Sequence, residues 1–391
     1  MNNLFETDDD LIDLNSVVGG VSASTEMRPE YKAWHKPRKQ WVREKQWWDC
    51  LVTMLSRNER EFANVEIIKY FGLPGGDLLD IEYFCQKFLG TEESRRKQFL
   101  FHGITNNEED KNAAESRLSK IYDYPFVNSS SKVEKYEFSA LEDPRSLIWG
   151  GVEKNGFFHM INLDFCDSLF KNGTLEAMIA LLSYQFNHKN GIPWLLCLTT
   201  RIDKSGISSD LLDKLKELIV KYTTEEGIRE DINQRFQSAY DNITNILFES
   251  TTELVKLSDM LQVCFVLWII ENAFSNQVKV ELCSSARYNV HSGNDFPDMS
   301  SLVFRFTHRK PEPRDETGLV TVAVTHQTLL TEANKITAKK AALRKIAYYI
   351  NLDSVLRDDR NLFEHYAMEM KLLLTKCGWN VDGYDEFISN N

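Results

Sequence analysis

The feature that most constrains this chain is a short apolar segment followed by a glycine turn and a helical segment. Residues 65–71 (VEIIKYF) are strand-like, the turn that follows reads GLPGG, and residues 77–89 (DLLDIEYFCQKFL) carry apolar side chains at helical intervals. Apolar strands that alternate with helices of about ten residues or more are typical of parallel βαβ units. This part of the sequence therefore predicts a parallel sheet whose two faces are covered by helices.

The same alternation recurs further along the chain. We expect strands at residues 98–103, 157–165 and 193–200, and helices at residues 36–55, 106–122, 174–188 and 362–376. Three long helical segments lie at residues 208–222, 227–247 and 252–274. Strand-like segments return at residues 278–283, 302–308 and 319–325, and the last two alternate in polarity as an antiparallel pair does.

These segments predict a doubly wound, Rossmann-like α/β sheet that is mostly parallel, with an antiparallel terminal hairpin and a helical insertion. A chain of 391 residues is long enough for such a domain with appendages. The expected divisions are a flexible acidic leader (1–30), the first part of the Rossmann-like domain (31–204), the helical insertion (205–275), the end of that domain (276–350) and a C-terminal helical extension (351–391).

Composition narrows the class of protein. A net charge of -12 argues against binding to nucleic acid through the overall field of the protein. The seven cysteines are scattered singly and the eight histidines form no HExxH pattern, so we expect no metal site and reduced thiols. The acidic start MNNLFETDDDLIDL is unlike a secretory signal, and the longest apolar run, residues 263–270, is shorter than a membrane span. The sequence therefore predicts a cytoplasmic protein without a membrane segment.

Residues that follow the expected strands are the candidates for a binding site, because ligands of open parallel sheets lie outside the carboxyl ends of the strands. The GLPGG turn allows a backbone to approach a ligand, although any tight connection uses the same residues. Asn162 and Asp164 interrupt an apolar strand near its end, where burial without partners is costly. Two interpretations stay open for them: hydrogen bonds to neighbouring loop amides, or contact with a ligand.

The order of these segments, with glycines after the first strand and Asn-x-Asp at the end of a later one, resembles the class I S-adenosylmethionine (SAM)-dependent methyltransferases over roughly residues 36–350. The resemblance implies that SAM is the cofactor and that an acceptor is methylated, with nucleic acid as one acceptor class. It assigns Gly72, Gly75 and Gly76 to the cofactor, Asn106 or Glu108 to its ribose, and Asn162 and Asp164 to the reaction site.

The chain departs from this family in two places. The family usually has an acidic residue before Gly-x-Gly, whereas this chain reads Lys69-Tyr70-Phe71-Gly72-Leu73-Pro74-Gly75-Gly76. The second strand ends in HGITNN without a prompt acidic residue. The chain therefore resembles a divergent member with a Leu-Pro-Gly-Gly first turn. The alternative is a catalytically inactive scaffold or binding subunit of a multi-protein bacterial system, such as one for phage defence, with partner proteins held by the leader or the insertion. A third interpretation is an α/β enzyme that binds another adenosine ligand.

The basic helix expected at residues 36–55 is the candidate nucleic-acid surface. Arg38, Lys39, Arg43 and Lys45 alternate there with tryptophans, so cations could meet phosphates while aromatic rings stack on bases. The other interpretation is an amphipathic helix that packs its tryptophans into the fold and keeps the basic side chains in water.

Overall fold

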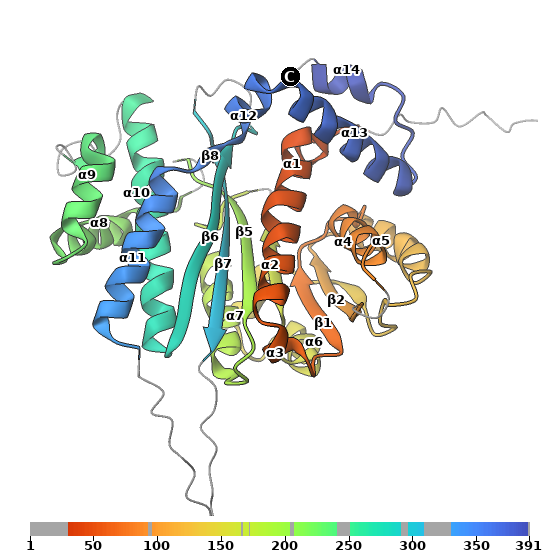
Figure 1. Cartoon of the computed structure of the whole chain (residues 1–391), viewed down its shortest axis with the longest axis horizontal. Helices are drawn as coiled ribbons and strands as arrows, with labels where there is room; N and C mark the ends of the chain where they lie inside the picture. Colours follow the sequence, from red (N-terminus) through yellow and green to blue (C-terminus); the bar gives the residue numbers. More distant parts are fainter. Residues whose placement is uncertain are drawn as a thin grey trace, which may run out of the picture.

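One eight-stranded sheet forms the centre of the protein in the computed structural model (Figure 1). The residues described are 30–92, 96–165, 167–171, 173–203, 207–240, 251–290, 296–308 and 330–389. The strands are β1 (Ile67–Gly72), β2 (Gln98–Thr105), β3 (Lys132–Lys135), β4 (Met160–Asp164), β5 (Trp194–Arg201), β6 (Val278–Tyr288), β7 (Met299–His308) and β8 (Ile350–Asn351).

The strand order is β3-β2-β1-β4-β5-β7-β6-β8. The first five strands of that order are mutually parallel, whereas β7 runs antiparallel to both β5 and β6. The direction of winding reverses between β1 and β4, which makes their carboxyl ends the expected ligand position of a doubly wound sheet. The predicted Rossmann-like fold class is thereby confirmed from the connectivity of this chain.

Helices cover both faces of the sheet. They are α1 (Pro37–Trp41), α2 (Asp49–Arg57), α3 (Glu59–Phe62), α4 (Leu79–Leu89), α5 (Glu108–Ile121), α6 (Leu147–Asn155), α7 (Thr174–Asn187), α8 (Ser209–Thr224), α9 (Arg229–Tyr240), α10 (Thr251–Ser275), α11 (Glu332–Ala347), α12 (Leu352–Asp358), α13 (Arg360–Lys376) and α14 (Tyr384–Ser389). Two 3-10 turns, η1 (Ala33–His35) and η4 (Phe138–Glu142), and the π-helix η2 (Val42–Trp48) complete the described elements.

Alternate side chains of each central strand enter different cores, because successive residues of a strand point to opposite faces. Phe71 and Ile161 join the core that also contains residues of α6 to α11, whereas Tyr70 and Met160 join the core with α1, α2, α4, α5 and α13. Burial on both faces explains why these strands are almost continuously apolar.

The first folded segment is a continuous helical rod made of α1, η2 and α2, which we call the N-terminal rod (residues 37–57). It confirms the helix expected at residues 36–55. Its middle turn is a π-helix, which advances the side-chain register relative to an α-helix. Trp47, Leu51 and Met54 on its inner side are buried against the sheet.

The strands expected near residues 65–71, 98–103, 157–165, 193–200, 278–283 and 302–308 are confirmed as β1, β2, β4, β5, β6 and β7. The antiparallel pairing expected between residues 302–308 and 319–325 is not tested, and β7 instead runs antiparallel to β5 and β6. The strand expected at residues 319–325 lies outside the described residues. The short strands β3 and β8 were not expected from the sequence.

The helices of the expected insertion include α10, which packs against β6 and α11. Within α10, Leu257–Ser275 is the one described stretch long and apolar enough to cross a membrane, and 78% of its most apolar window is buried inside the fold. Such burial is what a core helix requires. The domain divisions at 204/205 and 275/276 stay predictions.

Candidate functional site at the carboxyl edge of the sheet

Gly75 is the open point of the turn between β1 and α4. It has φ +62°, it is exposed, and a Cβ added there would meet no atom within 4 Å. Leu78, at the end of the same turn, also has a left-handed backbone with φ 50°, although its side chain is buried. A left-handed non-glycine residue costs free energy and is retained where the surroundings impose it, often at binding sites. The turn therefore presents a constrained, accessible backbone at Gly75.

The other two glycines of the turn are closed. A Cβ on Gly72 would lie 2.5 Å from the Tyr70 hydroxyl oxygen, and a Cβ on Gly76 would lie 2.9 Å from Asp110 Oδ1. Packing within the protein already explains why both positions are glycine. Contact of Gly72 or Gly76 with a cofactor therefore stays a prediction. Of the three glycines assigned to the cofactor, only Gly75 offers open backbone.

The residues after β2 face solvent. Asn106 and Glu108 are both exposed, and Asn107 between them caps α5 by accepting a hydrogen bond from the Asp110 amide at 2.7 Å. Lys135 on β3 binds the Glu108 carboxylate at 3.0 Å and holds its pKa below the ordinary value. Asn106 is therefore the more available of the two candidates for a ribose hydroxyl.

Asn162 near the end of β4 is completely buried. Its Nδ2 donates to the Tyr70 hydroxyl at 3.2 Å, and its backbone carbonyl accepts from the amide of Leu73 at 3.2 Å, which ties β4 to the turn after β1. Its side-chain Oδ1 is buried with no hydrogen-bond partner among the described residues. A buried amide oxygen without a partner is costly, so it marks a place where a water or ligand donor would be stabilised.

Asp164 at the end of β4 forms an ion pair with Lys39 of the N-terminal rod. The two side chains are only 14% and 4% exposed, and the Lys39 ammonium lies 4.8 Å from the centre of the Trp47 ring. Burial opposes the charge of Lys39, but the carboxylates of Asp164 and Asp80 raise its pKa above the ordinary value. The position that the sequence assigned to catalysis is therefore covered by a charged lysine.

A second buried ion pair lies one turn further along the rod. Arg43 Nε donates to Asp80 Oδ1 of α4 at 2.6 Å, with both side chains buried. Burial raises the pKa of Asp80, and the charge of Arg43 opposes that rise. Two cations of the rod thus meet two carboxylates, one at the end of β4 and one on the helix that follows β1.

These ion pairs correct the expectations for the basic helix. Lys39 and Arg43, which we placed on a nucleic-acid surface or in water, are instead buried, and Arg38 pairs with Asp353 at 2.9 Å. Lys45 remains accessible, with its side chain 42% exposed. The tryptophans do pack inward, as the amphipathic interpretation expected, but two of the basic side chains follow them because buried carboxylates neutralise their charge.

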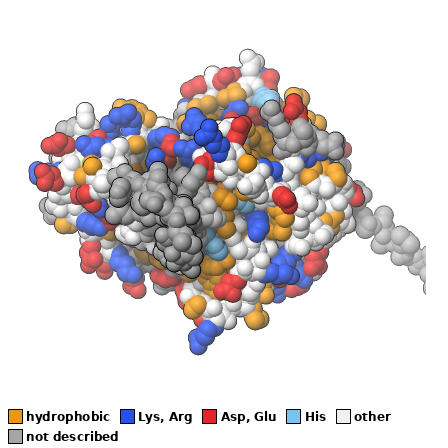
Figure 2. All heavy atoms as spheres, turned by 60° about the horizontal axis from the view of Figure 1, so that its bottom comes forward, with side chains coloured by type: hydrophobic (Ala, Val, Ile, Leu, Met, Phe, Trp, Pro, Cys, Tyr) orange, Lys and Arg blue, Asp and Glu red, His pale blue; other side chains and the backbone are white. Residues whose placement is uncertain are grey.

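Figure 2 shows the face that comes forward when the lower side of Figure 1 is turned toward the viewer. Among its described side chains, the blue basic groups are scattered between red acidic ones. Such a mixed surface has a weak local field, whereas phosphate binding needs clustered cations.

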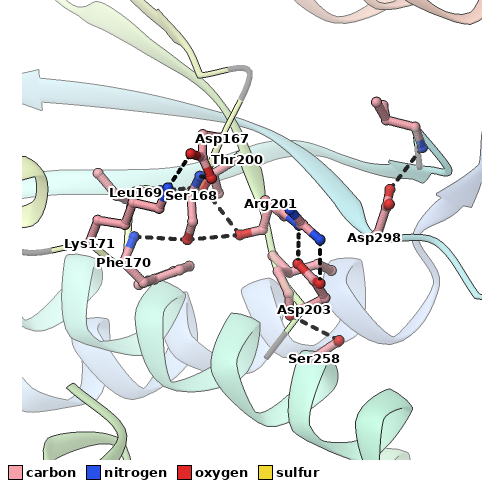
Figure 3. Close-up of polar contacts among 12 residues, drawn as sticks. Asp167, Ser168, Leu169, Phe170, Lys171, Thr200, Arg201, Asp203, Ser258 and Asp298 are labelled. Carbon is pink, nitrogen blue, oxygen red and sulfur yellow. Dashed lines mark hydrogen bonds and ion pairs between the residues drawn. The ribbon is translucent and has the colours of Figure 1, made fainter. Parts of the chain in front are cut away.

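The polar residues drawn in Figure 3, which lie after β4 and at the end of β5, form hydrogen bonds and ion pairs with one another. Thr200 Oγ1 accepts from the Leu169 amide at 2.7 Å, and Ser168 Oγ accepts from the Phe170 amide at 3.1 Å. Arg201 of β5 forms a two-point ion pair with Asp203. These side chains close their own loops, whereas the side chains of Asn162 and Asp164, for which loop amides were one expected partner, bond to Tyr70 and to Lys39.

Within the described residues, no three His, Cys, Asp or Glu side chains come together as ligands for a metal ion. The sequence reasoning identified Asp164 and the glycine turn but missed Lys39 and Tyr70 as the groups that cover them. Composition gave no signal for either, because a lysine in a basic stretch and a tyrosine in a strand are ordinary at those places.

One family model matches this chain, and several solved structures have a distant similarity to it. The model of the PP_RS20740-like family matches residues 28–389. No protein of curated function matches the sequence.

Three solved structures illustrate the distant similarity. A caffeoyl-CoA O-methyltransferase candidate from Staphylococcus aureus is 11% identical over 66% of this chain and 82% of its own, with a TM-score of 0.29. The 23S rRNA methyltransferase ErmE is 10% identical over 66% and 69%, with a TM-score of 0.27. The O-MT segment of StiE is 9% identical over 83% and 90%, with a TM-score of 0.29. At such low TM-scores, the fold assignment rests on the strand order of this chain.

Proposed function

We propose that this chain, which belongs to the PP_RS20740-like family, binds SAM at the carboxyl edge of β1, β2 and β4. The observation that carries the proposal is Gly75, a left-handed and uncovered glycine in the turn after β1, at the point where the winding of the sheet reverses. A turn used only for packing would be expected to cover its central glycine as it covers Gly72 and Gly76.

The residues around this turn fit an adenosine ligand in part. The accessible backbone of Gly75 and the exposed amide of Asn106 would supply hydrogen bonds, and the unpaired Oδ1 of Asn162 would accept one. SAM, when bound, supplies an electrophilic methyl group. The protein's own task would be to hold an acceptor in line with it, so positioning would account for most of the rate.

Asp164 is the residue that would orient an acceptor or take its proton, but its carboxylate is paired with the Lys39 ammonium. The Lys39 ammonium bonded to this carboxylate blocks the approach of an acceptor to it. We therefore propose that methyl transfer requires Lys39 to move away from Asp164. The acceptor stays unassigned; nucleic acid remains one class, without support from Lys39 or Arg43.

The second candidate is a scaffold that keeps the fold without catalysis. The Lys39–Asp164 pair favours the scaffold. This ion pair fills the position expected for methyl transfer, and separating its two buried charges would be costly. In this alternative, the acidic leader (1–30) and the helices of the span 205–275 contact partner proteins.

Isothermal titration with SAM and with S-adenosylhomocysteine separates the two. We expect saturable binding to the full chain, and loss of binding in Gly75→Trp, whose side chain would enter the open space at the turn. Gly383→Trp is the matched control, because Gly383 has φ +85° and an equally open Cβ direction in the connection to α14.

The outcomes are distinct. If the wild type binds neither compound, the scaffold is favoured and SAM binding is rejected. If Gly75→Trp binds as well as Gly383→Trp does, the ligand site lies away from this turn.

A further inference from the structure

Two of the six described cysteines reach the surface, and these two touch each other. Cys50 and Cys283 are partly exposed, whereas Cys85, Cys197, Cys264 and Cys377 are buried. The thiols of Cys50 and Cys283 are close enough to interact, although they come from distant parts of the sequence, and Cys283 Sγ also donates to the Glu281 carbonyl at 3.8 Å. A chance distribution of inert thiols gives no reason for the two accessible ones to be partners.

The rod and the sheet hold this pair in place. Cys50 lies on α2 of the N-terminal rod, one turn after Gln46, whose Nε2 donates to Ser284 Oγ of β6 at 3.0 Å and to the Ser301 carbonyl at 3.1 Å. Cys283 precedes Ser284 and sits at a break in the register between β6 and β7. Such a bulge turns a side chain out of the regular alternation of the strand.

The surroundings make the two thiols unequal. The hydrogen bond from Cys50 lowers the pKa of the Cys283 thiol against the effects of burial and of Glu281, with help from the charges of Arg305 and Lys345. The same hydrogen bond and burial raise the pKa of the Cys50 thiol. Lys345 is anchored beside Cys283, because its Nζ donates to the Cys283 carbonyl at 2.7 Å. Thiolates are the reactive form of cysteine, and the ammonium of Lys345 is held beside Cys283, so we assign Cys283 as the nucleophile of the pair.

We propose that Cys50 and Cys283 form a site of reversible oxidation that takes hydrogen peroxide and closes to a disulfide between the N-terminal rod and β6. Cys283 attacks one peroxide oxygen, so an S–O bond forms, the O–O bond breaks, and the departing oxygen leaves as water with the available protons. Cys50 then attacks the oxidised sulfur, an S–S bond forms, and the S–O bond breaks to release a second water. Two thiols and one peroxide thus give one disulfide and two waters.

The disulfide would fasten the segment that carries Lys39. Cys50 and Lys39 belong to the same helical rod, and the crosslink would close a long loop between α2 and β6. Crosslinks that close long loops restrict the unfolded chain strongly, so the oxidised protein should be more heat-stable than the reduced one. The oxidation itself does not depend on whether the chain binds SAM.

The test is peroxide treatment of the full chain, followed by digestion and mass spectrometry without reductant. We expect a peptide pair linked through Cys50 and Cys283, an increase in Tm of about 5 °C, and reversal of both by dithiothreitol. In Cys50→Ser, dimedone should label Cys283 as a sulfenic acid, because the second thiol is missing. In Cys283→Ser, Cys50 should stay unlabelled. Cys377→Ser is the control and should form the linked pair as the wild type does.

Two results would overturn the proposal. One is a wild type in which no linked pair forms while Cys50 or Cys283 is oxidised singly. The other is consumption of the buried Cys85 and Cys264 as fast as Cys283. Circular dichroism of each serine variant verifies that it has folded before its thiols are interpreted.

Discussion

Replacing Lys39 by methionine tests how much the buried ion pair at the end of β4 contributes to the free energy of unfolding. Methionine keeps most of the side-chain volume next to Trp47 but removes the charge, which leaves Asp164 buried without its partner. Removal of one member of a buried pair costs about 3–5 kcal/mol. Because the two side chains are only 4% and 14% exposed, we expect Lys39→Met to lower the free energy of unfolding by about 4 kcal/mol.

The control is Lys45→Met in the same rod. Lys45 is 42% exposed and pairs with Glu44 at 2.8 Å on the surface, so its loss should change the free energy of unfolding by less than about 1 kcal/mol. The double variant Lys39→Met/Asp164→Leu should regain much of the stability, because it removes the stranded carboxylate and leaves an apolar contact. The assay is urea denaturation at pH 7 followed by tryptophan fluorescence.

The pH of that assay follows from the direction of the pKa shift. The folded-state pKa of Lys39 is raised above its unfolded value of about 10.4. Its stabilising contribution is therefore fully present below the unfolded pKa and is lost only as the pH rises through the higher folded pKa. If Lys39→Met proves no less stable than Lys45→Met at pH 7, the reasoning from burial is wrong.

Two further predictions concern other parts of the sheet. A Cβ on Gly103 would lie 2.7 Å from Pro74 Cγ, so Gly103→Ala should destabilise the protein by about 1–3 kcal/mol. Gly150 lies in open space on α6, so Gly150→Ala should stabilise the protein by about 0.5–1 kcal/mol. Equal effects of the two substitutions in thermal denaturation would contradict the packing argument. Burial and nearby cations lower the pKa of His159 to about 3, so its contribution is present above pH 6.5 and is lost as the pH falls toward 3. His159→Asn should flatten that part of the stability profile by up to about 1.4 kcal/mol per pH unit, and an unchanged slope in urea titrations would refute the assignment.

Local patterns in the sequence were sufficient for most of the architecture. The apolar runs that became β1 and β5 are read correctly because a strand buried on both faces must be apolar along its length. The glycine turn after β1 was also predicted, since a left-handed residue such as Gly75 has a strong composition signal. In contrast, β3 and β8 are only four and two residues long, so they carry no periodicity and their pairing partners define them.

The candidate site was predicted only in part. Asp164 could be singled out, because a carboxylate that interrupts an apolar strand is costly to bury. Its partner could not, because Lys39 is 125 residues away and looks like one cation in a basic stretch. The same holds for Cys50 and Cys283, which the sequence shows as two unrelated single cysteines.

The sequence by itself thus determined which segments become strands and helices, because periodicity and turn residues act over a few neighbours. Only the tertiary structure decided which basic side chains are buried. That choice depends on whether packing brings a carboxylate to each cation, and a charge is stable inside a protein only when such a partner is within reach. Lys39 and Arg43 found partners inside the fold, whereas Lys45, a few residues along the same rod, stayed in water.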